Sequence, residues 1–144
     1  MSNPTTSTVT IAATADDVRA VLFDIANFPT WSTSFKAVTV LASNGDGRPT
    51  QAKLTVDAGA VKDKPTLNFD WSAYPDRVDY SLDDADLLTD MSGAYIVKDN
   101  GDETEVTFEL TVALSMPVPE VMRTKAEKAT IDLTLKQLKE KLEN

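Results

Sequence analysis

Between residues 51 and 114, several segments of the chain alternate hydrophobic and polar residues with a period of two. This alternation is typical of strands that bury one face of a sheet. The clearest case runs from Val106 to Leu114, where every second residue is hydrophobic. Gly-containing turns separate some of these segments, as at residues 44–47 and 99–102. The pattern predicts strands over residues 8–12, 37–41, 51–58, 66–73, 77–82, 91–97 and 104–114.

Two segments have helical spacing instead. Thr14 is placed to cap the first helix, with Asp17 three residues later, and Pro29 ends or kinks that helix. The second helix runs from about Val118 to Leu142. Its hydrophobic residues form two rows that are both predicted to face the sheet, namely Val118, Met122, Ala126, Ala129 and Leu133, and Ile131, Leu135, Leu138 and Leu142.

The order of elements is one strand, a helix, a run of about six strands and a long C-terminal helix. Several connections between successive strands are of hairpin length, so the sheet is predicted to be antiparallel. We therefore expect one α+β domain over residues 1–144, with about six to seven strands.

The composition excludes several kinds of active site. The chain has no cysteine and no histidine, which removes thiolate metal sites, cysteine nucleophiles and Ser-His triads. The densest acidic cluster lacks the ligand spacing and the glycine of a calcium loop, and is interpreted as a solvated rim. It consists of Asp83, Asp84, Asp86 and Asp90. We predict no metal and no cofactor.

A net charge of −9 disfavours nucleic acid and anionic membrane surfaces as partners. No hydrophobic run approaches the ~18 residues of a membrane span, and the polar residues 1–7 do not resemble a signal peptide. We expect a cytoplasmic protein without stable membrane insertion. We also expect a monomer, because the two rows of the long helix together are wider than a coiled-coil seam.

Several short motifs resemble those of a known family. They are Ile11-Ala12-Ala13 before the first helix, Val18, Val21 and Asp24 within it, Phe28-Pro29-Thr30-Trp31 after it, and then Gly93-Ala94-Tyr95, Thr104-Glu105-Val106 and Pro117. The chain thus resembles, over nearly its whole length, the polyketide cyclase/dehydrase and lipid-transport family of the START superfamily (the SRPBCC type). The resemblance implies the helix-grip fold, in which a curved antiparallel sheet wraps a long C-terminal helix and leaves a cavity. It implies architecture more than activity, because that superfamily contains carriers, receptors and cyclases.

The inward face of the four central strands is predicted to carry no Asp, Glu, Lys or Arg. Its polar atoms belong to Trp71, Tyr80 and Tyr95, and tyrosine, which titrates near ~10, is poorly suited to acid–base catalysis at neutral pH. No catalytic residue is therefore predicted. A one-residue shift in strand register would turn Asp57 or Asp70 inward and favour an enzyme.

An apolar cup with a few polar tips is typical of a small-molecule site. The candidate lining residues are Trp31, Phe35, Leu54, Val56, Phe69, Trp71, Tyr80, Leu82, Met91, Tyr95, Phe108, Leu110, Met122, Ala126 and Ala129. For each aliphatic residue in this list, ordinary core packing explains the position as well as cavity lining does. Trp31 either guards the cavity mouth or anchors the short helical segment.

Three functions stay open. We favour binding or carriage of a small hydrophobic ligand that resembles a lipid, polyketide or isoprenoid. The alternative is an aromatase/cyclase- or dehydratase-like enzyme on a polyketide-type substrate, in which a tyrosine hydroxyl is a weak acid and proximity supplies most of the rate. The third is a protein-interaction module, which requires a filled interior and an exposed apolar patch of more than a few hundred Å².

Overall fold

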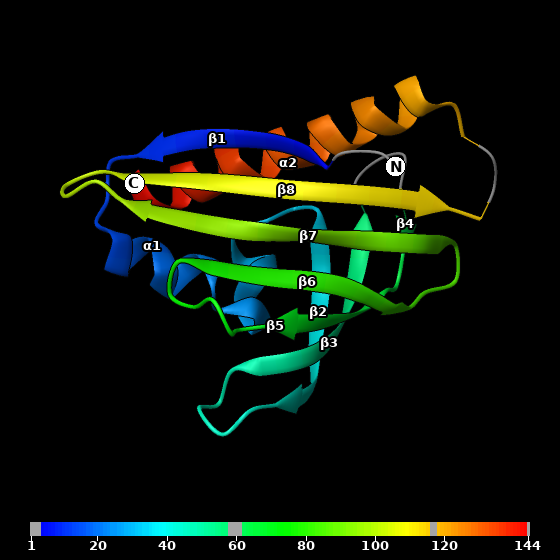
Figure 1. Ribbon diagram of the computed structural model, residues 1–144, viewed down its shortest axis with the longest axis horizontal. Helices are drawn as coiled ribbons and strands as arrows, with labels where there is room; N and C mark the ends of the chain where they lie inside the picture. Colours follow the sequence, from blue (N-terminus) through cyan, green and yellow to red (C-terminus); the bar gives the residue numbers. More distant parts are fainter. Residues whose placement is uncertain (1–3, 58–61, 116–117, 144) are drawn as a thin grey trace.

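The computed structural model describes residues 4–57, 62–115 and 118–143, and its strands form one antiparallel sheet (Figure 1). The order across the sheet is β1-β8-β7-β6-β5-β3-β2, and β4 pairs with β3 beside this path. The strands are β1 (Thr5–Ile11), β2 (Phe35–Ser43), β3 (Pro49–Asp57), β4 (Lys62–Asp63), β5 (Thr66–Asp70), β6 (Arg77–Asp84), β7 (Leu88–Asp99) and β8 (Thr104–Leu114). The predicted α+β helix-grip class is confirmed, with the two-residue strand β4 as an addition.

The strand boundaries follow the alternation most closely where it is longest. β8 spans the predicted residues 104–114, whereas β7 begins three residues before the predicted start at Met91. β2 begins at Phe35, before the alternating stretch that marked it in the sequence. Ala58 and Pro117, which were predicted to end a strand and to precede the last helix, lie outside the described residues.

The first helical region is divided into two parts. The α-helix α1 (Ala15–Leu22) begins as predicted, because the Thr14 hydroxyl oxygen accepts a hydrogen bond from the Asp17 amide at 3.3 Å. The 3₁₀ segment η1 (Ile25–Thr30) follows and contains Pro29. Proline cannot donate a backbone hydrogen bond, so a continuous α-helix through this position is disfavoured.

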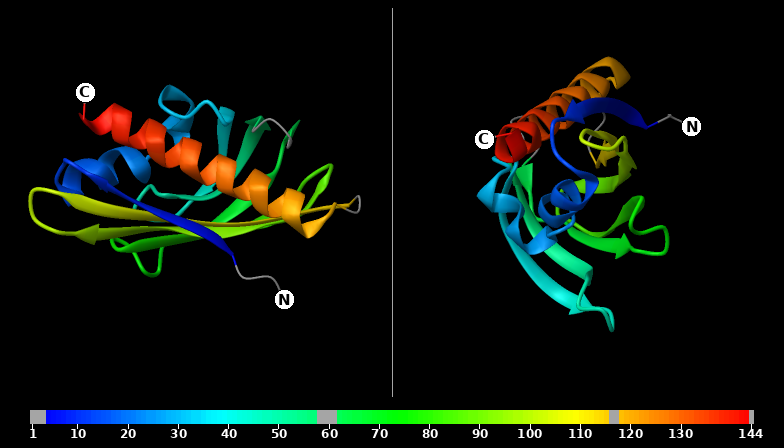
Figure 2. Two further views of the ribbon diagram at one scale, coloured as in Figure 1. Left: turned by 90° about the horizontal axis from the view of Figure 1, so that it is seen from above. Right: turned by 90° about the vertical axis from the view of Figure 1, so that its left-hand side faces the viewer.

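All helical segments lie on the concave side of the sheet. The long helix α2 (Glu120–Glu143) runs diagonally behind β1 and β8, and α1 with η1 lies on the same side (Figure 1). The end-on view in Figure 2 shows the sheet curving around both. The buried hydrophobic residues of strands and helices form one cluster in this concave space.

Side-chain hydrogen bonds attach α2 to the edge strand β1. The Glu127 carboxylate accepts from the Thr5 hydroxyl at 2.6 Å, and its other oxygen accepts from the Val112 amide of β8 at 2.7 Å. Further along, Lys139 donates to the Thr10 carbonyl and Glu143 accepts from the Ala12 amide. These bonds cover an edge that would otherwise present unpaired backbone groups.

The buried face of α2 differs from the prediction. Of the first predicted row, Met122 is 61% exposed, Leu133 is 39% exposed and Ala129 is also exposed, while Ala126 is half-buried. The buried positions are Glu127, Ile131, Thr134, Leu135 and Leu138. The prediction that both rows face the sheet was wrong, because two buried positions on the true face carry the polar residues Glu127 and Thr134.

Gly93 lets β6, β7 and β8 approach closely at the centre of the sheet. It pairs with Tyr80 on one side and with Leu110 on the other. The Tyr80 hydroxyl donates a hydrogen bond to the Glu109 carbonyl of β8 at 3.0 Å, across the intervening strand β7. A Cβ at position 93 would lie 1.9 Å from that carbonyl oxygen and 2.8 Å from the Tyr80 hydroxyl. Only glycine fits here.

We therefore expect Gly93→Ala to lower the free energy of unfolding by about 2 kcal/mol or more, because backbone of β8 has to move. Urea denaturation measures this change. Gly45→Ala is the matched control, since a Cβ there meets no atom within 4 Å, and it should change stability by less than about 0.5 kcal/mol. Equal effects of both substitutions would contradict this account of the sheet.

Candidate functional site

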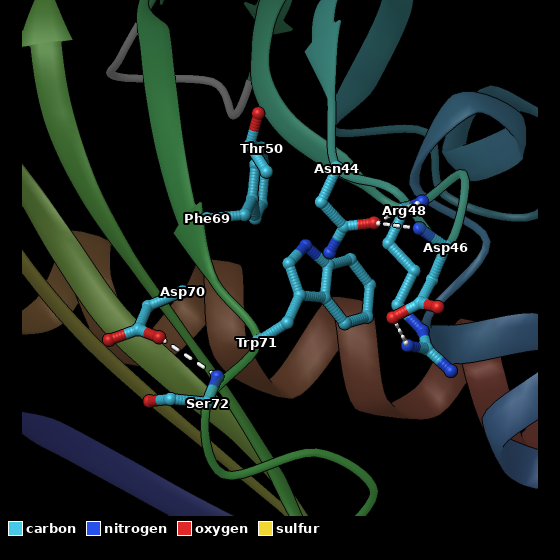
Figure 3. Close-up of a pocket in the computed structure, with 8 residues that line it drawn as sticks. All are labelled: Asn44, Asp46, Arg48, Thr50, Phe69, Asp70, Trp71 and Ser72. Atoms are coloured by element: carbon cyan, nitrogen blue, oxygen red, sulfur yellow. Dashed lines mark hydrogen bonds and ion pairs between the residues drawn. The ribbon is translucent and has the colours of Figure 1, made fainter.

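One hollow of about 480 Å³ lies at the surface between the β2–β3 hairpin and the end of β5 (Figure 3). Its lining consists of Asn44, Asp46, Arg48, Thr50, Phe69, Asp70, Trp71 and Ser72. The Arg48 guanidinium lies 4.0 Å from the centre of the Tyr74 ring and pairs with Asp46 at 3.2 Å. Six of the eight lining residues are polar or charged, so this is not the apolar cup predicted from the sequence.

Trp71 belongs to the rim of the molecule. Its indole N–H donates to the Pro49 carbonyl at 2.6 Å, and its ring packs edge-on against Phe23 with centroids 6.0 Å apart. It is half-buried and lies beyond the end of β5. This hydrogen bond of the indole holds the β2–β3 hairpin against the end of β5.

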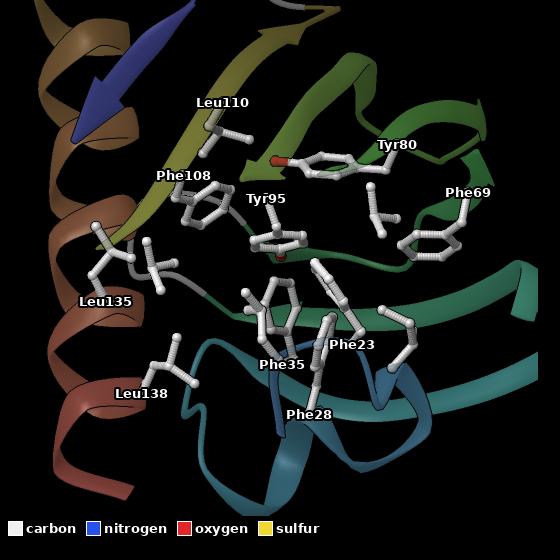
Figure 4. Packing of buried hydrophobic residues seen from close by; sticks show 14 of the residues in the cluster. Phe23, Phe28, Phe35, Phe69, Tyr80, Tyr95, Phe108, Leu110, Leu135 and Leu138 are labelled. Atoms are coloured by element: carbon white, nitrogen blue, oxygen red, sulfur yellow. The ribbon is translucent and has the colours of Figure 1, made fainter. Parts of the chain in front are cut away.

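The interior on the concave side is aromatic (Figure 4). Of the predicted lining residues, the structure buries together Trp31, Phe35, Leu54, Val56, Phe69, Tyr80, Met91, Tyr95, Phe108 and Leu110. Leu82 and Ala126 are half-buried, whereas Met122 and Ala129 are exposed on α2 and lie outside this cluster. Sequence reasoning missed Phe28, which is 1% exposed and touches several of these rings.

The rings are in direct contact. The Tyr95 ring lies tilted against Phe108 with centroids 4.7 Å apart, and its centroid is 5.5 Å from that of Tyr80. From the helical side, Phe28 lies 6.0 Å from Tyr95 and 5.3 Å from Phe35. Such pairs stabilise a core beyond their buried area, and they also give a flat apolar surface to any molecule that enters.

Both interior tyrosines are held in the neutral form. Burial raises the pKa of Tyr80 well above its usual value, and nearby acidic groups add to the shift. Burial also raises the pKa of Tyr95. The Tyr80 hydroxyl is occupied by the Glu109 carbonyl, whereas no hydrogen bond joins the Tyr95 hydroxyl to another described residue. Tyr95 therefore offers an uncharged donor inside the apolar space.

Trp31 packs inside rather than at an open mouth. It is 8% exposed, follows the last residue of η1 and meets Phe28 edge-on at 5.7 Å. Its indole N–H is buried and has no hydrogen-bond partner among the described residues. The ring thus holds η1 against the aromatic cluster and leaves one polar group unused.

A family model described as "Polyketide cyclase / dehydrase and lipid transport" matches residues 5–143 of this chain. The chain belongs to this family. The match covers the sheet and all helical segments, and it agrees with the resemblance seen in the sequence. A comparison with curated proteins found no significant match.

Several solved structures share the fold of this chain. A START superfamily protein from Mycobacterium smegmatis is 26% identical, with a TM-score of 0.90 and coverage of 99% of this chain and 98% of that one. A Thermus thermophilus protein is 18% identical, with a TM-score of 0.79 and 96% coverage of both chains. The Zhui aromatase/cyclase of a Streptomyces species is 17% identical, with a TM-score of 0.69 and coverage of 97% and 88%.

Other features set limits on the chemistry of this polyketide cyclase/dehydrase family member. Within the described ranges no group of three or more acidic residues is arranged to hold a metal ion, and Asp83, Asp84 and Asp86 are exposed. Asp57 is half-buried and Asp70 is exposed. The one-residue shift in strand register that would turn either carboxylate inward therefore does not occur. Among the same residues, no helix has the length and hydropathy needed to span a bilayer.

Two buried carboxylates were not anticipated, and both serve the fold. Glu127 joins α2 to β1 and β8, as described above. Asp63 of β4 is 8% exposed and accepts backbone hydrogen bonds from Lys64, Asp86, Leu87 and Leu88 at 2.7–3.2 Å. The sequence gives no signal for this, because three of the four donors belong to a turn more than twenty residues away.

The pKa of Asp63 is set by two opposing effects. Burial raises it, but the four backbone N–H groups together outweigh burial and lower the pKa below its usual 3.8. The folded state therefore holds the proton less tightly than the unfolded state. The stabilisation from the ionised carboxylate is complete above pH 3.8 and is lost as the pH falls through the folded-state pKa.

Asp63→Asn should consequently lower the free energy of unfolding at pH 7 by about 2–4 kcal/mol, because an amide NH₂ replaces the oxygen that accepts from Leu87 and Leu88. The difference from the parent should shrink below pH 3.8. Urea titrations between neutral and acidic pH measure both effects. Asp86→Asn, at a nearby exposed carboxyl, should change little, and a pH-independent difference for Asp63→Asn would contradict the assignment.

Proposed function

We propose that the protein binds a small hydrophobic molecule between the concave face of its sheet and α2. The observation that carries this proposal is the interior itself, in which aromatic rings contact the ring of Tyr95, whose hydroxyl is a neutral donor without a partner among the described residues. An apolar pocket with a few placed polar groups is the usual form of a small-molecule site. Membership of a family described by lipid transport and polyketide cyclisation supports the same function.

Carriage is favoured over catalysis by the state of the titratable groups. Acid–base catalysis at neutral pH needs a pKa tuned toward the working pH, and burial moves the pKa of Tyr80 and Tyr95 in the opposite direction. In both buried carboxylates, Asp63 and Glu127, each oxygen accepts a hydrogen bond from a backbone N–H or a hydroxyl group. A cyclase activity in this interior would have to depend on proximity and on a neutral phenol.

The test of binding is a thermal-shift screen with fatty acids, sterols, flavonoids and aromatic polyketides. A compound present at 100 times its Kd adds about 2.7 kcal/mol of stability, which raises the Tm of a domain of this size by several degrees. A reproducible rise for one chemical class is the expected result. No rise across the panel would contradict the proposal and would favour a protein partner, for which the exposed Val121 and Met122 at the start of α2 are the first residues to test.

The double variant Tyr80→Phe, Tyr95→Phe separates binding from turnover. If the protein is a carrier, the variant should lose roughly tenfold or less in affinity, because it lacks at most one hydrogen bond to the ligand. If the protein is an enzyme, a polyketide-type substrate should be converted by the parent and not by the variant, as measured by mass spectrometry. Tyr74→Phe, at the half-buried rim tyrosine, is the matched control.

A further inference from the structure

Four buried polar atoms have no hydrogen-bond partner among the described residues. They are Trp31 Nε1, Ser32 Oγ, Ser34 Oγ and Thr134 Oγ1. Ser32, Ser34 and Thr134 are each 1% exposed, and Trp31 is 8% exposed. A single unpaired buried polar group costs about 1–3 kcal/mol, so four of them need an explanation beyond packing.

These atoms belong to two segments that meet. The amide of Thr33 donates to Gln137 Oε1 at 3.0 Å, and Gln137 Nε2 donates back to the Thr33 hydroxyl at 2.9 Å. This pair fixes residues 31–34 beside the turn of α2 that contains Thr134. Figure 2 shows the segment after η1 lying against the C-terminal half of α2 in both views.

The same place adjoins the aromatic interior. Trp31 contacts Phe28, which in turn contacts both Phe35 and Tyr95. On α2, Thr134 lies on the face that also buries Ile131, Leu135 and Leu138. A ligand on the aromatic rings that extended toward this junction would have one end beside the segments that carry the four atoms.

The chemistry of the four groups defines what that end carries. The indole N–H only donates, and the three hydroxyls both donate and accept. Among the described residues no Lys or Arg is buried. A carboxylate or phosphate would lose its hydration here without a countercharge, which is strongly unfavourable. An uncharged oxygen meets no such penalty.

We propose that Trp31, Ser32, Ser34 and Thr134 form a polar subsite for a ketone or hydroxyl oxygen at one end of an otherwise hydrophobic ligand. This inference rests on the proposed binding function and adds to it a class of ligand. It selects oxygenated neutral molecules, such as aromatic ketones and alcohols, and it rejects fatty-acid carboxylates and phospholipid headgroups at this position.

The test compares three probes of similar shape, namely anthrone, dihydroanthracene and an anthracene carboxylate. One hydrogen-bonded oxygen is worth about 3- to 10-fold in affinity, so the parent should bind anthrone at least threefold more tightly than dihydroanthracene, and the carboxylate more weakly than anthrone. In the double variant Ser34→Ala, Thr134→Val the preference for anthrone should decrease, through weaker binding of anthrone alone, because only the Trp31 N–H and the Ser32 hydroxyl remain. Thr130→Val is the matched control, because that hydroxyl already donates to the Ala126 carbonyl.

Each outcome has a distinct meaning. Equal binding of anthrone and dihydroanthracene, or a preference that is unchanged in the double variant, overturns the subsite and leaves the binding function intact. Failure of these probes and of the whole lipid and polyketide panel overturns both. The Tm of the ligand-free double variant should be unchanged or higher than that of the parent, since it loses unpaired hydroxyls. A Tm lower by several degrees would show that the hydroxyls have structural partners and would overturn the subsite.

Discussion

The curved sheet has one apolar face, and two separate helical segments are needed to cover it. η1 packs on β2 and α1 lies near β7, while α2 packs on β1 and β8, so the two helical regions meet on the concave side of the sheet. They meet through the paired hydrogen bonds of Thr33 and Gln137. A junction between two helical segments is harder to fill with side chains than the side of one helix, and the unpaired polar atoms gather there.

The positions of the buried carboxylates follow from the same arrangement of helices over the sheet. Among the residues that the structure describes, the two buried carboxylates bind backbone N–H groups, Glu127 that of Val112 near the start of β1 and Asp63 those of the β6–β7 turn. Both positions lie at the margins of the concave face. The centre is left to neutral groups, which suits recognition by shape and by single hydrogen bonds rather than by acid–base chemistry.

Much of this architecture was accessible from the sequence, and the exceptions have physical causes. Alternation predicted β8 and the inward faces of the strands, because a sheet with one buried face fixes the parity of every strand. Trp71 lies one residue beyond β5, where strand parity no longer applies, and its half-buried ring packs against the core cluster. Helical spacing failed to give the buried face of α2, because a buried glutamate that binds a backbone amide looks, in a sequence, like an ordinary solvent-facing residue.

Parts of the candidate site depend on contacts that no local pattern reveals. Tyr95 was predicted from its position on a strand, whereas Phe35 was expected in a turn or short helix and is instead the first residue of β2. Ser32 and Ser34 gave no signal, because small hydroxyl residues are common in surface turns, and here they are buried by a helix about a hundred residues later in the chain. Their burial is a property of the assembled fold, so it could be found only in the structure.

The pairing of β1 with β8 has a consequence for the synthesis of the chain. β1 is made first, yet Thr5 pairs with Leu110 and Ile11 with Thr104, so it stays without its partner until most of the chain has been translated. Its second neighbour, α2, is made later still. Contacts this distant in sequence slow folding and prolong the exposure of an unpaired strand. Residues 5–10 of β1 are mostly Thr and Ser, so the strand is hydrophilic while it is still unpaired. This composition protects the nascent chain from aggregation.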